Sequence, residues 1–140
     1  MRYLIVFLIV ILPFTALAQE LKSKDDVRTF SESIMGKVAR GEIIEGLQLL
    51  KTHFPIPSSE FEVMVEKFRL QAPAIKQRFG DTVGVELIRE RELGQSLMMI
   101  HYVQKFEKTV MNWRFYFYRP KTTWIVSTFF TDDQLQDTFK

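Results

Sequence analysis

The stretch MNWRFYFYRP, residues 111–120, determines how the rest of the chain is interpreted. Successive side chains of a β-strand point to opposite faces of its sheet. Both faces of this strand receive large rings: Trp113, Phe115 and Phe117 on one face, Tyr116 and Tyr118 on the other. An antiparallel strand with one face in water carries polar residues on that face. The stretch therefore predicts a strand that is covered on both sides.

The surrounding sequence predicts three more strands of an antiparallel sheet. Alternation with a period of two marks the segments 83–92, 95–105 and 124–130. One face of the second of these carries Leu97, Met99, His101 and Val103, and the other carries Met98, Ile100, Tyr102 and Phe106. In the last segment the alternation groups Trp124, Val126 and Phe130 against Ile125 and Phe129. Charges at Glu86 and at residues 89–92 indicate that the first strand is a solvated edge strand.

The part of the chain between residues 25 and 79 has the periodicity of helices. Apolar residues recur every three or four positions in the segments 25–41, 43–50 and 59–79. The third segment opens on a capping-box pattern, with Ser59 at the cap and a glutamate three residues on. Pro73 either kinks this third helix or starts a new turn, because proline interrupts the hydrogen-bond ladder.

Helices followed by hairpin-connected strands predict an α+β fold. We expect the N-terminal helices to pack on a curved, four-stranded antiparallel sheet with a cone-like shape. A last short helix is expected after Asp132, carrying Leu135 and Phe139. The chain has no internal repeat, low-complexity tract or linker, so residues 19–140 are expected to form one domain.

The first eighteen residues, MRYLIVFLIVILPFTALA, follow the pattern of a secretory signal peptide. We expect cleavage after Ala18, which leaves a domain without a stable membrane span; an uncleaved N-terminal anchor is the alternative. The chain has no cysteine, so it depends on packing rather than on disulfides. Export to a bacterial periplasm suits this composition better than secretion as a small eukaryotic domain. The net charge of +2 includes no basic stripe, which argues against nucleic acid as a partner.

Two segments carry a resemblance to a known superfamily. They are ARGEIIEGLQLLKTHF, residues 39–54, and FYFYRPKTTWIVSTFFTDDQLQDTF, residues 115–139. In this order they resemble the second helix region and the closing strand pair of the nuclear transport factor two-like (cystatin-like) superfamily, and among its members small exported bacterial proteins of unknown function. The resemblance implies a cone with a pocket and dimerisation through the sheet. It implies no particular reaction, because this fold hosts many functions.

The apolar second face of the sheet has three candidate explanations. A strongly curved sheet could enclose a cavity for a small apolar ligand. A second copy of the chain could pack on the outer face as a homodimer. The face could instead meet a membrane or another protein. A fourth interpretation leaves Tyr116 and Tyr118 half exposed, with their hydroxyl groups in water.

Catalytic chemistry has one weak candidate, His101, which could act as an acid or base if it faced a cavity. The aspartates all lie at expected termini or turns, which disfavours an isomerase that needs a buried carboxylate base. Two distant histidines without cysteine make a zinc site improbable, and no cofactor is expected. Arg114, among rings, could hold an acidic ligand group, stack on Tyr116 or Trp124, or pair with a strand glutamate.

The sequence favours an exported, non-enzymatic binding or assembly module, with an apolar cavity or a sheet-face dimer interface. The alternative is a small lyase or isomerase that uses His101. The residues expected to line the ligand site or the interface are Met99, His101, Trp113, Arg114, Phe115, Tyr116, Tyr118 and Trp124.

Overall fold

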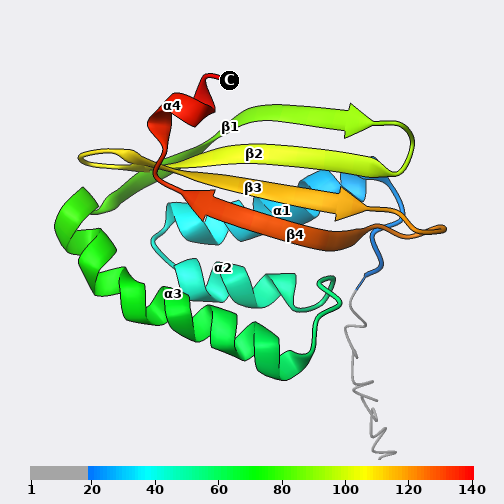
Figure 1. Cartoon of the computed structure of the whole chain (residues 1–140), viewed down its shortest axis with the longest axis horizontal. Helices are drawn as coiled ribbons and strands as arrows, with labels where there is room; N and C mark the ends of the chain where they lie inside the picture. The colour runs from blue at the N-terminus through cyan, green and yellow to red at the C-terminus, as the bar shows by residue number, and fades with distance from the viewer. Residues whose placement is uncertain (1–18) are drawn as a thin grey trace, which may run out of the picture.

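The structure is a computed structural model that describes residues 19–140, so the expected signal peptide, residues 1–18, lies outside the described residues. The elements are α1 (Lys24–Ala39), α2 (Ile43–Leu50), α3 (Ser58–Phe79), β1 (Thr82–Leu93), β2 (Leu97–Phe106), β3 (Val110–Tyr118), β4 (Ile125–Asp132) and α4 (Leu135–Thr138). The strands form one antiparallel sheet in the order β1-β2-β3-β4. Helices α1, α2 and α3 lie on one face of this open sheet, and α4 lies on the other (Figure 1). The predicted α+β class is therefore confirmed.

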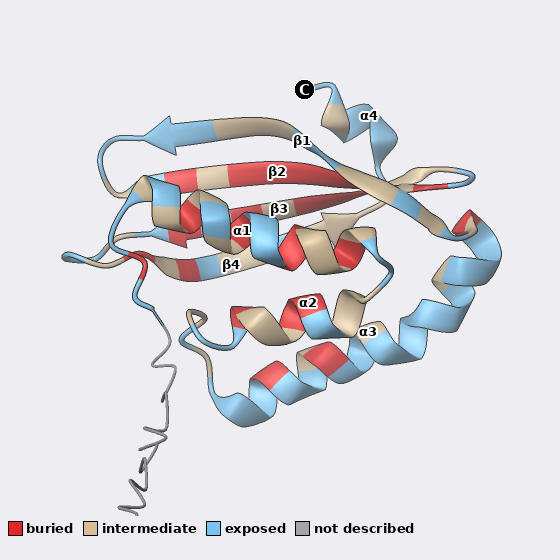
Figure 2. Ribbon diagram, turned by 180° about the vertical axis from the view of Figure 1, so that it is seen from behind, coloured by how far each residue is buried: buried red, intermediate tan, exposed pale blue. Residues whose placement is uncertain are grey.

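The inner face of the sheet, toward α1, α2 and α3, holds the core. Buried residues concentrate in the two central strands, β2 and β3 (Figure 2). The inner-face residues of these strands are Met98, Ile100, Tyr102, Gln104, Phe106, Met111, Trp113, Phe115 and Phe117, and all are buried. Phe68 of α3 stacks on Trp113 at 6.1 Å and on Phe129 at 6.2 Å, measured between ring centroids. The predicted division of faces is thus correct for β2 and β3.

The predicted faces of β4 are wrong after Val126. Phe117 pairs with Val126, but Tyr116 pairs with Thr128, so Ser127 is an extra residue in the ladder. Such a bulge shifts every later side chain to the opposite face. Phe129 therefore joins the core, whereas Phe130 lies on the outer face, 57% exposed, with its ring 6.0 Å from that of Tyr116.

Helix α3 begins differently from the prediction, but it continues through Pro73 with a bend, which is one of the two alternatives that the sequence left open. Ser59 is not a cap, because α3 starts at Ser58 after Pro57 and has no side-chain cap hydrogen bond. The capping box lies instead at the start of α1, where Ser23 and Asp26 bond each other's backbone N–H groups. Helix α3 runs through Pro73, which is exposed to solvent, and bends toward the sheet in its last turns (Figure 1). Proline kinks are tolerated where the freed carbonyl group meets water.

Strand β1 is an edge strand, as predicted, but its acidic residues are not simply solvated. Glu90 and Glu92 point to the helix side of the sheet. There the Arg28 Nε atom lies 2.9 Å from a Glu90 carboxylate oxygen, and the Lys24 Nζ atom lies 2.6 Å from one of Glu92. These ion pairs fasten α1 across the edge strand. Arg91, between the two glutamates in sequence, points to the outer face.

The bulge at Ser127 predicts that substitutions at Phe129 and at Phe130 differ in their effect on stability. Phe129→Ala is expected to lower the free energy of unfolding by roughly 2–4 kcal/mol, because it removes a ring packed in the core. Phe130→Ala is expected to cost less than about 1 kcal/mol, since this ring is mostly in water. Urea denaturation followed by tryptophan fluorescence measures both values. The reverse ranking would show that β4 is unbulged.

Candidate functional site

The strand register arranges the outer-face side chains in rows across the sheet. The first row contains Leu93, Leu97, Tyr118 and Ile125. The second contains Arg91, Met99, Tyr116 and Thr128. The third contains Arg89, His101, Arg114 and Phe130. The fourth contains Glu86, Val103, Asn112 and Asp132.

The chain's own C-terminal tail, residues 133–140, covers the fourth row. Asn112 is fully buried and holds the tail through its amide group. Its Nδ2 atom donates to Asp132 Oδ1 at 2.8 Å and to the Gln134 carbonyl at 3.1 Å. Its Oδ1 atom accepts from Thr138 Oγ1 at 2.7 Å. Because a buried amide needs all its partners, Asn112 fixes the tail over this part of the sheet.

His101 lies in the third row, at the margin of the tail, and is only 2% exposed. Its Nε2 atom lies 2.9 Å from Asn112 Oδ1, an acceptor, so Nε2 carries the proton of the imidazole. Burial lowers the pKa of His101 below 6.5, and the nearby Arg114 and Arg89 lower it further, whereas the bond to Asn112 opposes this shift. The side chain is thus kept as a neutral member of the network beneath the tail.

The first two rows remain uncovered by the tail, and we call them the open half of the outer face. A depression of about 440 Å³ lies there. It is lined by Arg91, Leu93, Leu97, Met98, Met99, Tyr116, Phe117, Ser127 and Thr128. The bulge lies at this hollow, because both Ser127, the extra residue, and Thr128, the partner of Tyr116, belong to its lining. Leu93 and Leu97, at the rim, are 62% and 45% exposed.

The predicted site residues divide between the two faces of the sheet. Met99 and Tyr116 line the depression, and Tyr118 lies beside it in the first row. Arg114 lies in the third row, where it forms an ion pair with Asp132 of β4. His101 and Arg114 thus lie next to the depression without lining it.

The other three predicted residues lie on the inner side and take no part in this site. Trp113 and Phe115 are fully buried in the core. Trp124 is buried before β4, where its backbone N–H donates to the Leu21 carbonyl at 2.7 Å. The Trp124 Nε1 atom has no hydrogen-bond partner among residues 19–140. The sequence could not separate these residues from Met99 and Tyr116, because both faces of the strands are equally apolar.

Sequence reasoning missed Arg91, Leu93, Leu97, Ser127 and Thr128 as members of the site. Leu97 shares the alternation of Met99, which was a usable signal. Arg91 and Leu93 belong to a strand whose charges suggested only an edge. Ser127 and Thr128 come together through the bulge, which has no sequence signal of its own.

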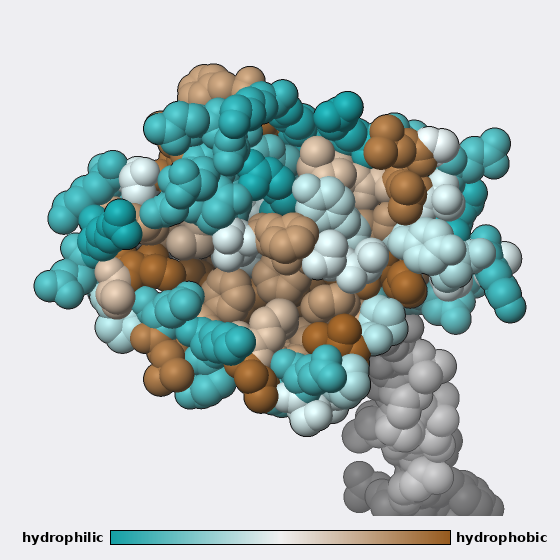
Figure 3. Space-filling view, viewed as in Figure 1, coloured by the Kyte–Doolittle hydropathy of each residue, from teal (hydrophilic) through white to brown (hydrophobic). Residues whose placement is uncertain are grey.

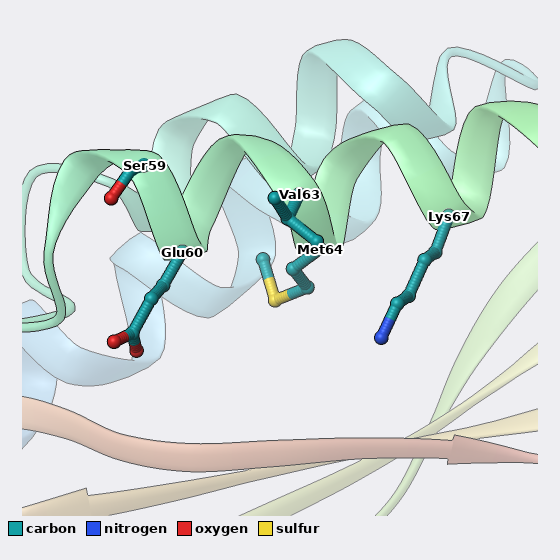
Figure 4. Close-up of a pocket in the computed structure, with 5 residues that line it drawn as sticks. All are labelled: Ser59, Glu60, Val63, Met64 and Lys67. Carbon is teal, nitrogen blue, oxygen red and sulfur yellow. The ribbon is translucent and has the colours of Figure 1, made fainter.

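The space between the helices and the sheet is largely filled by rings, with hollows at its margins, two of which are lined by residues of α3. One, of about 410 Å³, is lined by Ser59, Glu60, Val63, Met64 and Lys67. Figure 4 shows that all five side chains come from α3, with β4 on the opposite side. The other, of about 230 Å³, lies between α2, α3 and β3 beside Phe68. Apolar residues also gather in the middle of the face that Figure 3 shows.

The described residues offer no other obvious chemical centre. Within residues 19–140 no three histidine, cysteine or acidic residues lie together as metal ligands would. None of the helices in this same range has the length and the apolar character needed to cross a bilayer.

The position of His101 predicts how stability depends on pH. The unfolded chain binds a proton with a pKa near 6.5, whereas the folded chain resists protonation, so acid favours unfolding. The contribution of His101 is complete above pH 6.5 and is lost as the pH falls below this value. Each such histidine contributes a slope of at most about 1.4 kcal/mol per pH unit.

Urea denaturation measures this slope between about pH 7.5 and about pH 5, the range in which histidine titrates. His101→Gln is expected to flatten it. His53→Gln is expected to flatten the slope as well, because burial also lowers the pKa of His53, and the effects of the two substitutions should add. A His101→Gln slope equal to that of the wild type would contradict the assignment.

The chain matches no protein-family model, and neither a curated protein nor a solved structure is similar to it at a significant level. The resemblance to the nuclear transport factor two-like superfamily therefore stays a prediction, and the case for a function depends on the geometry of the outer face.

Proposed function

We propose that the protein is a non-enzymatic binding module that holds a small apolar molecule on the open half of its outer sheet face. The observation that carries this proposal is the depression of about 440 Å³ over Met99 and Tyr116. Its volume lies in the range of small-molecule sites, which is roughly 300–1,000 Å³. Its lining is mainly apolar, as ligand sites are.

The exposed side chains around the depression support a bound partner. Leu93, Leu97 and Phe130 leave large parts of their surface in water. A cluster of this kind on one face is typical of a binding surface, because burying apolar area releases about 25 cal/mol per Å². The floor is formed by four strands that are paired in sequence, so little conformational order has to be gained on binding.

The alternative enzyme, a lyase or isomerase based on His101, has less support. A general acid or base must reach the reacting group within hydrogen-bond distance. The Nε2 atom of His101 is engaged by Asn112, and His101 lies one row away from the depression. Asp132, the aspartate of β4, is held by Arg114 and Asn112. We therefore assign His101 a structural role.

A homodimer through the same face is the second candidate. Leu93, Leu97, Tyr118 and Phe130 surround the depression and are all exposed. A two-fold dimer would pair this surface with itself and bury all four side chains in one step. This arrangement is also what the superfamily resemblance implies.

We further propose that the protein acts after export to a bacterial periplasm. The signal-peptide pattern of residues 1–18 and the absence of cysteine support this location. A domain that binds an apolar molecule on a sheet face is also consistent with the superfamily that the sequence resembles.

Met99→Asn tests the proposed site, because it places a polar amide on the floor of the depression. Affinity for the uncharged apolar dye Nile red is expected to fall by roughly fivefold to tenfold, the loss expected for one buried side chain. Fluorescence titration measures the affinity. Val63→Asn is the matched control and should leave the affinity unchanged, because Val63 is exposed and lines the separate hollow of about 410 Å³ on α3, called the α3 hollow below.

Two results would contradict the proposed function. One is a wild-type protein that does not bind the dye, and the other is a Met99→Asn variant that binds it as tightly as the wild type. Size exclusion with light scattering, without any ligand present, distinguishes the homodimer from the ligand-binding module. If the homodimer is correct, the wild type is a dimer and Met99→Asn is a monomer.

A further inference from the structure

We infer that the molecule held in the depression is an amphipathic anion, an apolar chain or ring with one negative group that lies beside Arg91. This inference rests on the proposed function and names its ligand class. It follows from how the sheet separates the charges of β1 and from which residues occupy the first three rows.

The alternation of β1 isolates Arg91 from the glutamates that flank it in sequence. Glu90 and Glu92 point to the inner side, where Arg28 and Lys24 of α1 neutralise them. Arg91 points to the outer side and lines the depression. It has no ion-pair partner among residues 19–140, and it is exposed. A run in which arginine and glutamate alternate thus presents one positive charge, and no negative charge, to the depression.

The neighbouring row adds positive charge without adding acid. The first three rows contain three arginines, Arg89, Arg91 and Arg114, and no aspartate or glutamate. Arg89 donates to the Thr138 carbonyl rather than to a carboxylate, and Arg114 is paired with Asp132 of the fourth row. Both arginines also act on His101, where they disfavour a further positive charge. The surroundings of the depression therefore favour an anion.

This charge distribution favours an anionic ligand over the other occupants of the same surface. A second copy would bring another face with unpaired arginine and no acid in its open half, and like charges across an interface oppose association. A neutral apolar ligand would cover the depression but would leave the positive charge of Arg91 without a counter-charge. A guanidinium group is well suited to a carboxylate or a phosphate, to which it donates two parallel hydrogen bonds.

The α3 hollow provides a natural control, because it also combines apolar residues with one cation. Val63 and Met64 lie there beside Lys67 (Figure 4). Its lining also includes Glu60, so an anion there meets a like charge. Arg91→Gln therefore removes one positive charge from the depression, and Lys67→Gln removes one from the α3 hollow. Both side chains are exposed, so neither change is expected to disturb the fold.

The test is isothermal titration calorimetry on the full chain as it is produced, with probes kept below their micelle concentrations. The probes are decanoate, decyl phosphate and the uncharged 1-decanol. We expect wild type to bind the two anions more tightly than the alcohol. Arg91→Gln should weaken the binding of decanoate and of decyl phosphate by about tenfold, the lower end of what one charge-assisted hydrogen bond contributes, and leave the binding of the alcohol unchanged. Lys67→Gln should change none of the affinities.

The outcomes separate this inference from the proposed function. Equal affinity for the alcohol and the anions, with no effect of Arg91→Gln, overturns the anionic ligand and leaves an apolar site. A loss in Lys67→Gln instead of Arg91→Gln moves the anion to the α3 hollow and overturns the inference. Failure of every probe, together with failure of Nile red, removes the proposed function itself. A stronger response to decyl phosphate than to decanoate identifies phosphate as the anion and upholds the inference.

Discussion

The alternation of side chains along a strand is the constraint on which the whole structure depends. Because successive residues must point to opposite faces, the rings of β3 cannot all reach one core. Three helices cover the inner face, where Trp113, Phe115 and Phe117 are buried. The helices α1, α2 and α3 do not cover the outer face. The tail covers one part of it, through Asn112, and the open half keeps its apolar surface.

The same alternation sorts the charges as well as the rings. In β1 it sends Glu90 and Glu92 to α1 and leaves Arg91 on the outer side. The stability of the helix layer and the character of the outer face are therefore coupled through one short run of sequence. A single-residue change of register would place the two acids in the open half and Arg91 against the basic side chains of α1. The bulge positions along the sheet thus bear on function as much as on packing.

The sequence by itself determined the fold class, the order of the elements and the two faces of β2 and β3. These features depend on local periodicity and on the residues that end helices and strands, and both can be recognised along the sequence. The same patterns identified Met99, Tyr116 and Tyr118 as candidates. They also placed Trp113, Phe115 and Trp124 in the same set, because a strand with two apolar faces does not reveal which face the helices will cover.

Only the tertiary structure decided which rings belong to the core and which to the outer face of β4. The bulge at Ser127 exchanged Phe129 and Phe130, and a bulge results from how two strands fit together rather than from a local preference. The closure of the tail over His101 depends on contacts between Asn112 and Thr138, which lie far apart in sequence. Long-range pairing of this kind sets the site, because a binding surface is a property of neighbouring strands, whereas periodicity is a property of one.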